Sequence, residues 1–252
     1  MAVLPHDVLG DGPHHVLALH GWLSDRSAFE PITRQLDTDR FTWAFVDYRG
    51  YGEAMRVAGE HTTAETASDV LAVADSLGWP NFSLVGHSMG GKVAASVLAE
   101  SPERVRKIVG VSPVPASGVP FDEQAWELFS GAAESAANRR AIIDMTTGGR
   151  LSGRWLDAMV RRSLDRSTVA AFAGYLRDWA RTDFQQKISG DTTPMLLIAG
   201  EHDPALSAEM LRDTWTRHHP NAQVELFRNA GHYAIEEAPL ITVTRIEEFL
   251  AS

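Results

Sequence analysis

Short runs of apolar residues alternate with amphipathic segments along most of the chain. Helical patterns follow the first two runs, at Ala28–Leu36 and Ala64–Gly78. Continuous apolar strands separated by helices are typical of a parallel sheet covered on both faces. The segment before His15 leaves room for one short further strand. The runs that we predict to be buried strands are His15–His20, Thr42–Tyr48, Phe82–Gly86, Val105–Ser112, Pro194–Gly200 and Gln223–Asn229.

The alternation stops between about Pro113 and Gly190. This stretch contains no convincing buried strand and has the pattern of several helices. It carries 10 Lys plus Arg against 9 acidic residues, whereas the whole chain carries 23 against 33. Prolines mark its beginning, and Ser189–Pro194 marks its end. We therefore predict an α/β fold: a mostly parallel sheet flanked by helices, formed by residues 1–112 and 191–252, with a helical cap inserted at 113–190, here called the cap segment.

Composition narrows the function classes. The net charge of -10 argues against general binding to nucleic acid or to anionic membranes. The chain has no cysteine, which excludes disulfides, thiolate metal sites and a cysteine nucleophile. No apolar run approaches the roughly 18 residues of a membrane helix, and the first residues lack the features of a secretory signal. We expect a cytoplasmic monomer or homodimer.

The stretch Gly86-His87-Ser88-Met89-Gly90 lies between a predicted strand and a predicted helix. It fits the pattern G-x-S-x-G, whose sharp turn exposes a serine hydroxyl at the end of the sheet. The start of the helix adds backbone N–H groups and a partial positive charge. The context therefore predicts Ser88 as a nucleophile rather than as a small turn residue.

A serine nucleophile needs a base, and the base needs an acid that orients it. In this sheet topology both follow the serine, the acid first and the histidine second. Asp203 comes three residues after the strand that ends at Gly200, and His232 lies in the loop after the next strand. Of the ten histidines, only His232 combines such a loop with the right chain order. The loop after the Val105–Ser112 strand holds no competing acid.

Attack on a carbonyl group also requires donors for the oxyanion. These are usually two backbone N–H groups, one after the nucleophile and one after an early strand. Met89 would supply the first. Trp22 is the candidate for the second, because Gly21 allows a close approach of the backbone.

The motifs together resemble those of α/β-hydrolase fold enzymes of the small single-cap esterase group. They are HGW, DYRGYG, GHSMGG, GEHD and AGHYAIEEAP, and they cover nearly the whole chain outside the cap segment. The resemblance implies a triad of Ser88, Asp203 and His232, with backbone oxyanion donors at Trp22 and Met89. Tyr51 and Ala54 replace the histidine and serine that the family often has, which affects the loop beside the site. The short N-terminal region also suggests that an edge strand of the family is missing.

The leading hypothesis is hydrolysis of a small carboxylic ester through an acyl-enzyme, without a cofactor. Neither His14-His15 nor His218-His219 has metal-ligand spacing with supporting acids, so we predict no metal site and expect the second pair to be solvated. The alternatives are lactone or amide hydrolysis, C–C bond cleavage, perhydrolysis and cyanohydrin cleavage by the same triad. A ligand receptor without turnover is a further class. Ser88 argues against a haloalkane dehalogenase, which has an aspartate there.

Large apolar side chains of the cap segment predict a substrate with an uncharged, apolar or aromatic acyl group. The nine arginines of the segment are the competing signal, for an anionic substrate. Because acids are nearly as frequent there, we expect most of these arginines to be solvated or paired. The candidate pocket residues are Trp22, Trp126, Phe129, Trp155 and Tyr175.

Overall fold

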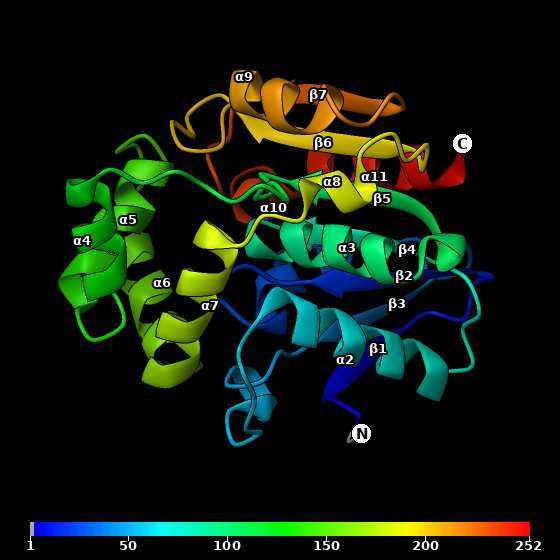
Figure 1. Cartoon of the computed structure of the whole chain (residues 1–252), viewed down its shortest axis with the longest axis horizontal. Coiled ribbons are helices and arrows are strands. Elements are labelled where there is room, and N and C mark those ends of the chain that lie inside the picture. Colours follow the sequence, from blue (N-terminus) through cyan, green and yellow to red (C-terminus); the bar gives the residue numbers. More distant parts are fainter. Residues whose placement is uncertain (1–2) are drawn as a thin grey trace.

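The computed structural model, which describes residues 3–252, is built on a seven-stranded sheet in the order β1-β3-β2-β4-β5-β6-β7 (Figure 1). β1 pairs with β3 in antiparallel orientation, and all other pairs are parallel. All six predicted strands are present, and β1 is the short further strand expected near the N-terminus. The fold class is confirmed. The strands are β1 (His6–Leu9), β2 (His14–Leu19), β3 (Phe41–Val46), β4 (Phe82–His87), β5 (Val105–Val111), β6 (Met195–Gly200) and β7 (Ala222–Phe227).

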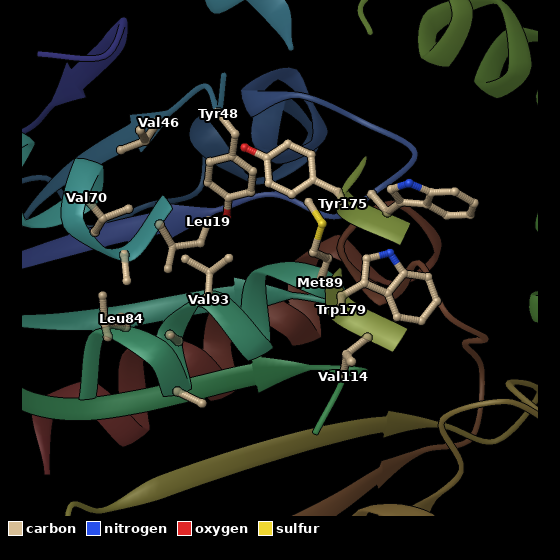
Figure 2. Close-up of a cluster of buried hydrophobic side chains, with 14 of the residues drawn as sticks. Leu19, Val46, Tyr48, Val70, Leu84, Met89, Val93, Val114, Tyr175 and Trp179 are labelled. Carbon is tan, nitrogen blue, oxygen red and sulfur yellow. The ribbon is translucent and has the colours of Figure 1, made fainter. Parts of the chain in front are cut away.

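Helices cover both faces of the sheet, which explains why its strands are continuous apolar runs. α2 (Thr63–Ser76) and α3 (Met89–Glu100) lie on one face, and α10 (Ala234–Glu237) and α11 (Pro239–Ala251) on the other (Figure 1). Along β2, alternate side chains enter two separate hydrophobic clusters, one on each face. Figure 2 shows part of the α2–α3 cluster, which extends to Met89 at the start of α3.

The structure departs from the predicted helix at Ala28–Leu36. A 3₁₀ turn at Arg26–Phe29 is followed by a single helical turn, α1 (Glu30–Thr33). The Asp25 side chain accepts the N–H of Ser27, which fixes the beginning of the turn. A segment this short has little helical stability of its own and depends on burial of its apolar side chains in the core.

The cap segment is helical, as its pattern predicts. Its four longer helices stand together beyond one end of the sheet, whereas the short α8 lies against α3 (Figure 1). Each of the four longer helices has an N-cap residue whose side chain accepts a backbone N–H of the first turn, which favours helix formation there. These N-cap residues are Asp122, Ser135, Ser152 and Thr168. The helices are α4 (Glu123–Gly131), α5 (Ala136–Thr146), α6 (Gly153–Asp165), α7 (Val169–Arg181) and α8 (Gln185–Ile188).

One arginine of the cap segment departs from the expectation of solvated or paired charges. Arg139 is 1% exposed and has no carboxylate partner within residues 3–252. Its guanidinium donates to the Ala132 carbonyl at 2.8 Å and to the Ser163 hydroxyl at 2.7 Å, and it lies 3.7 Å from the centre of the Phe172 ring. Burial lowers its pKa to about 10. Arg139 therefore holds the cap helices together rather than facing a substrate.

The expectation of two solvated histidines fails for His219, which is 1% exposed. α9 (Ala208–Leu211) continues into a π-helical turn at Arg212–Thr216. His219 lies three residues beyond this turn, packs near Trp215 and lies 3.3 Å from the Gln185 amide of α8. Burial lowers its pKa.

A buried lysine joins α3 to the end of the cap segment. The Lys92 ammonium donates to the carbonyl oxygens of Trp179, at 3.0 Å, and of Thr182. Burial lowers its pKa from 10.5 to about 8. Two pH units above neutrality, the Lys92 side chain is therefore mostly neutral in the folded protein, whereas it is still charged in the unfolded chain.

Lys92 thus gives a prediction for stability at alkaline pH. Between about pH 8 and 10 the unfolded chain binds more protons at this residue, so its contribution to the free energy of unfolding increases with pH. We expect the difference between wild type and Lys92→Met to change by about 1 kcal/mol per pH unit in that window. Urea unfolding measured from pH 7 to pH 10 would test this. The exposed Lys187→Met is the matched control, and a pH-independent difference for Lys92→Met would contradict the prediction.

Candidate active site

Ser88 occupies the turn between β4 and α3. Its backbone has φ 55° and ψ -118°, a conformation that is costly for a residue other than glycine. Close packing of the backbone holds it there. A Cβ atom added at Gly86 would lie 2.3 Å from the Gly90 carbonyl oxygen, and one added at Gly90 would lie 2.1 Å from that of Leu19. The two glycines of the motif are therefore required by the turn, which presents Ser88 at the end of the sheet.

Asp203 and His232 are brought together from two neighbouring strand ends. His232 Nδ1 lies 2.7 Å from Asp203 Oδ2. The other carboxylate oxygen, Oδ1, accepts the N–H groups of Ala205 at 2.9 Å and Leu206 at 3.2 Å. Burial raises the pKa of the Asp203 carboxyl, but the nearby His232 and these hydrogen bonds outweigh it, and the net pKa is lowered. Asp203 is thus an ionised carboxylate at neutral pH that accepts the Nδ1–H of His232.

Ser88 and His232 line the same cavity. Within residues 3–252 their side chains are not hydrogen-bonded to each other. In free enzymes the bond between nucleophile and base is often long and tightens only when the substrate binds. The sequence-predicted nucleophile and base thus line one cavity, and the sequence-predicted acid is bonded directly to the base.

The two predicted oxyanion donors have free N–H groups. Neither the N–H of Trp22 nor that of Met89 has an intramolecular acceptor in the described range 3–252. The Gly21 loop lies directly against the turn that bears Ser88, because a Cβ added at Gly21 would be 3.2 Å from the Ser88 Cβ. Unpaired N–H groups in buried residues are costly, and a developing oxyanion would satisfy them.

Sequence reasoning assigned no role to His20, which orders this loop. Its Nδ1–H donates to the Gly21 carbonyl at 2.9 Å, while Nε2 accepts the Tyr48 N–H at 3.2 Å. The two bonds fix one tautomer. Because the Gly21 carbonyl and the Trp22 N–H belong to the same peptide unit, His20 also fixes the direction of the predicted oxyanion donor.

His87, the residue before Ser88, is a second buried histidine at the site. Burial and the neighbouring His232 lower its pKa to about 3, so it is neutral at physiological pH. Its Nε2–H donates to the backbone carbonyl of His232 at 2.9 Å. His87 therefore supports the loop of His232.

The cavity is small and mostly apolar. Its volume is about 60 Å³. Two of the predicted pocket residues, Trp22 and Phe129, line it, and no lysine or arginine does. Among residues that sequence reasoning missed, Trp179 and Val114 belong to the same buried cluster as Met89, which Figure 2 shows. The other missed residues of the lining include Leu23, Val119, Phe121, Ile142, Thr146, Leu206 and Tyr233.

The other three predicted pocket residues lie outside this lining, each for a visible reason. Trp126 is covered by the Arg181 guanidinium, 3.8 Å from its ring centre. Trp155 donates its Nε1–H to Glu236 at 3.2 Å. Tyr175 is fully buried, and its hydroxyl lies 3.1 Å from that of Thr66 on α2. Trp155 and Tyr175 thereby join the cap segment to the core, whereas the contact between Trp126 and Arg181 lies within the cap segment. In sequence these three aromatic residues have the same pattern as the residues that line the cavity.

Residues 3–252 contain no group of three or more His, Cys, Asp or Glu placed to hold a metal ion. Among the same residues, the structure has no helix with the length and apolar character needed to span a membrane.

Comparisons with known proteins agree with this architecture. Residues 14–239 match the model of the family described as alpha/beta hydrolase fold. The chain is 28% identical to a 2-(acetamidomethylene)succinate hydrolase of Mesorhizobium japonicum, over 96% of this chain and 89% of that protein. It is 26% identical to a pimeloyl-[acyl-carrier protein] methyl ester esterase of Nitrosomonas europaea, over 92% and 93%. An esterase structure from Exiguobacterium antarcticum superposes with a TM-score of 0.88 at 19% identity, covering 98% of this chain and 95% of that one. The chain therefore belongs to the alpha/beta hydrolase fold family, and it is a hydrolase.

Proposed function

We propose that the protein hydrolyses a small, uncharged carboxylic ester through an acyl-enzyme intermediate. One observation carries the proposal: Ser88, in its strained turn, shares a cavity with His232, which is bonded to the buried carboxylate of Asp203. This is the arrangement that serine hydrolases use for acyl transfer. The methyl ester esterase among the relatives supports ester chemistry.

In the proposed reaction, His232 accepts the hydroxyl proton of Ser88 as the oxygen attacks the ester carbonyl carbon. The N–H groups of Trp22 and Met89 bind the resulting oxyanion. His232 then protonates the leaving alcohol, and Ser88 remains acylated. A water molecule, deprotonated by His232, attacks the acyl-enzyme and releases the acid. Asp203 keeps the Nδ1–H of His232 in place, so that Nε2 can exchange the proton in both steps.

The lining of the cavity supports a neutral acyl group. The name of the Mesorhizobium japonicum relative indicates a succinate derivative, which carries carboxylates. Binding carboxylates in an apolar cavity without a cationic side chain would be costly. A cavity that holds one water molecule needs about 10–15 Å³. The cavity volume of about 60 Å³ therefore suits only a short acyl chain. Phe129, Ile142, Thr146 and Trp179 belong to the cap segment, so we propose that this segment forms the roof of the acyl site.

A panel of p-nitrophenyl esters would test the function. We expect kcat/KM to be highest for the acetate or butyrate ester and at least about 10-fold lower for the octanoate, because the longer chain exceeds the free volume. A succinate half-ester should react more slowly than the butyrate ester at all salt concentrations. Faster reaction of the half-ester, with an advantage that fades with salt, would contradict the neutral-substrate proposal. Failure to release p-nitrophenol from any ester would favour a ligand receptor.

A further inference from the structure

The backbone around His232 is held at four points. Its own N–H donates to the Thr146 carbonyl of the cap segment at 3.0 Å, and its carbonyl accepts the Nε2–H of His87. The flanking N–H groups both donate to Glu237. The N–H of Gly231 lies 2.9 Å from Oε2, and that of Tyr233 lies 3.1 Å from Oε1. One carboxylate thus brackets the residue from both sides.

The Glu237 carboxylate is buried and, among residues 3–252, has one cationic partner. Its side chain is 3% exposed. Arg150, in the loop between α5 and α6 of the cap segment, donates Nη2–H to Oε2. A buried carboxylate without such a partner would be strongly destabilising. The pair therefore ties the loop of His232 to the cap segment.

The contact leaves little room for movement. A Cβ atom added at Gly231 would lie 3.2 Å from Glu237 Oε1 and 2.8 Å from the Thr146 carbonyl oxygen. Only a residue without a side chain lets the carboxylate and the cap segment approach the loop this closely. The Asp203 bond fixes Nδ1 of the imidazole ring, and the hydrogen bonds of the loop fix the backbone that carries the side chain.

We propose that Glu237 is a positioning residue for His232, and that Arg150 locks the Glu237 carboxylate in its bracketing position. The inference rests on the proposed function, in which His232 is the base. Reaction rates depend steeply on the placement of a base, and an error of about 1 Å can cost about 100-fold. Removal of the bracket should therefore slow the chemical step more than it weakens substrate binding.

The neighbouring Glu236 provides a matched control. It also forms an ion pair with an arginine of the cap segment, Arg162, and it accepts the Nε1–H of Trp155. It accepts none of the backbone N–H groups around His232 in the described range 3–252. Glu236→Gln therefore weakens a core–cap ion pair of the same kind without opening the bracket.

In Glu237→Gln the side-chain amide retains one acceptor oxygen and turns an NH₂ group toward the second N–H. We expect kcat for a short-chain ester to fall about 10- to 100-fold with KM within about 3-fold of wild type. Arg150→Gln should lower kcat in the same direction by a smaller factor. Glu236→Gln should keep kcat within about 2-fold. Equal losses in Glu237→Gln and Glu236→Gln, or an unchanged kcat in Glu237→Gln, would overturn the proposal.

A second measurement needs no turnover. The Nδ1–H proton of His232, bonded to Asp203, should give a low-field proton NMR signal that disappears in His232→Ala. We expect this signal to shift or broaden in Glu237→Gln and to stay in place in Glu236→Gln. An unmoved signal in Glu237→Gln would overturn the positioning role even if no ester is hydrolysed. Absence of turnover in wild type, with the signal shifted in Glu237→Gln, would instead reject only the proposed function.

Discussion

Replacing Ser88 by alanine is expected to lower kcat for ester hydrolysis by about 10⁶-fold, to the level that binding and the oxyanion donors alone can give. The change removes the atom that would form the acyl-enzyme. It should leave the fold intact, because the Ser88 hydroxyl makes no hydrogen bond within residues 3–252 and alanine is no more strained at this φ than serine. Single-turnover kinetics and thermal unfolding would measure the two effects separately.

Ser112→Ala is the matched control for this variant. Ser112 also follows a strand, has a positive φ of 44° and is fully buried, and its hydroxyl has no partner in the described part of the chain, but it does not line the cavity. We expect its kcat to stay within about 3-fold of wild type. A serine-directed phosphonate should label wild type and Ser112→Ala and fail to label Ser88→Ala. Labelling of Ser88→Ala, or full activity in that variant, would mean that another residue is the nucleophile.

The catalytic candidates could be predicted from the sequence because each follows a strand end. The carboxyl ends of parallel strands meet at one edge of the sheet, so residues far apart in sequence, such as Asp203 and His232, must lie close together there. The chain order of acid and base then leaves few choices. The structure adds the direct contact between these two residues, 2.7 Å between Nδ1 and Oδ2.

The lining of the cavity could not be predicted in the same way. Amphipathic helices show which residues are buried, but they do not show whether a buried side chain faces the cavity, another helix or the core. Phe129 and Tyr175 are both buried aromatic residues of the cap segment, yet Phe129 lines the cavity and Tyr175 packs on α2. Likewise, the burial of Arg139 depends on its partners Ala132 and Ser163, a contact with no sequence motif.

Replacing Asp203 by asparagine is expected to lower kcat by about 10⁴-fold, the size of effect that the wrong histidine tautomer produces. Asp203 Oδ1 accepts two backbone N–H groups, so the asparagine carbonyl should take that place. Its NH₂ group would then face His232 Nδ1 and donate to it. This bond requires an unprotonated Nδ1 and places the proton on Nε2, where His232 can no longer accept a proton from Ser88.

The measurement is kcat over a range of pH, with Asp69→Asn as the control. Asp69 is also a buried carboxylate, 1% exposed and bonded to Arg49, but it lies on α2 away from the cavity. Asp69→Asn should lose stability while keeping kcat within about 3-fold of wild type. Because the pKa of Asp203 is lowered, its carboxylate stays ionised across the neutral range, so titration of Asp203 should not limit the wild-type rate there. A rate within 10-fold of wild type in Asp203→Asn would contradict this role of Asp203 and point to a different acid that orients the base.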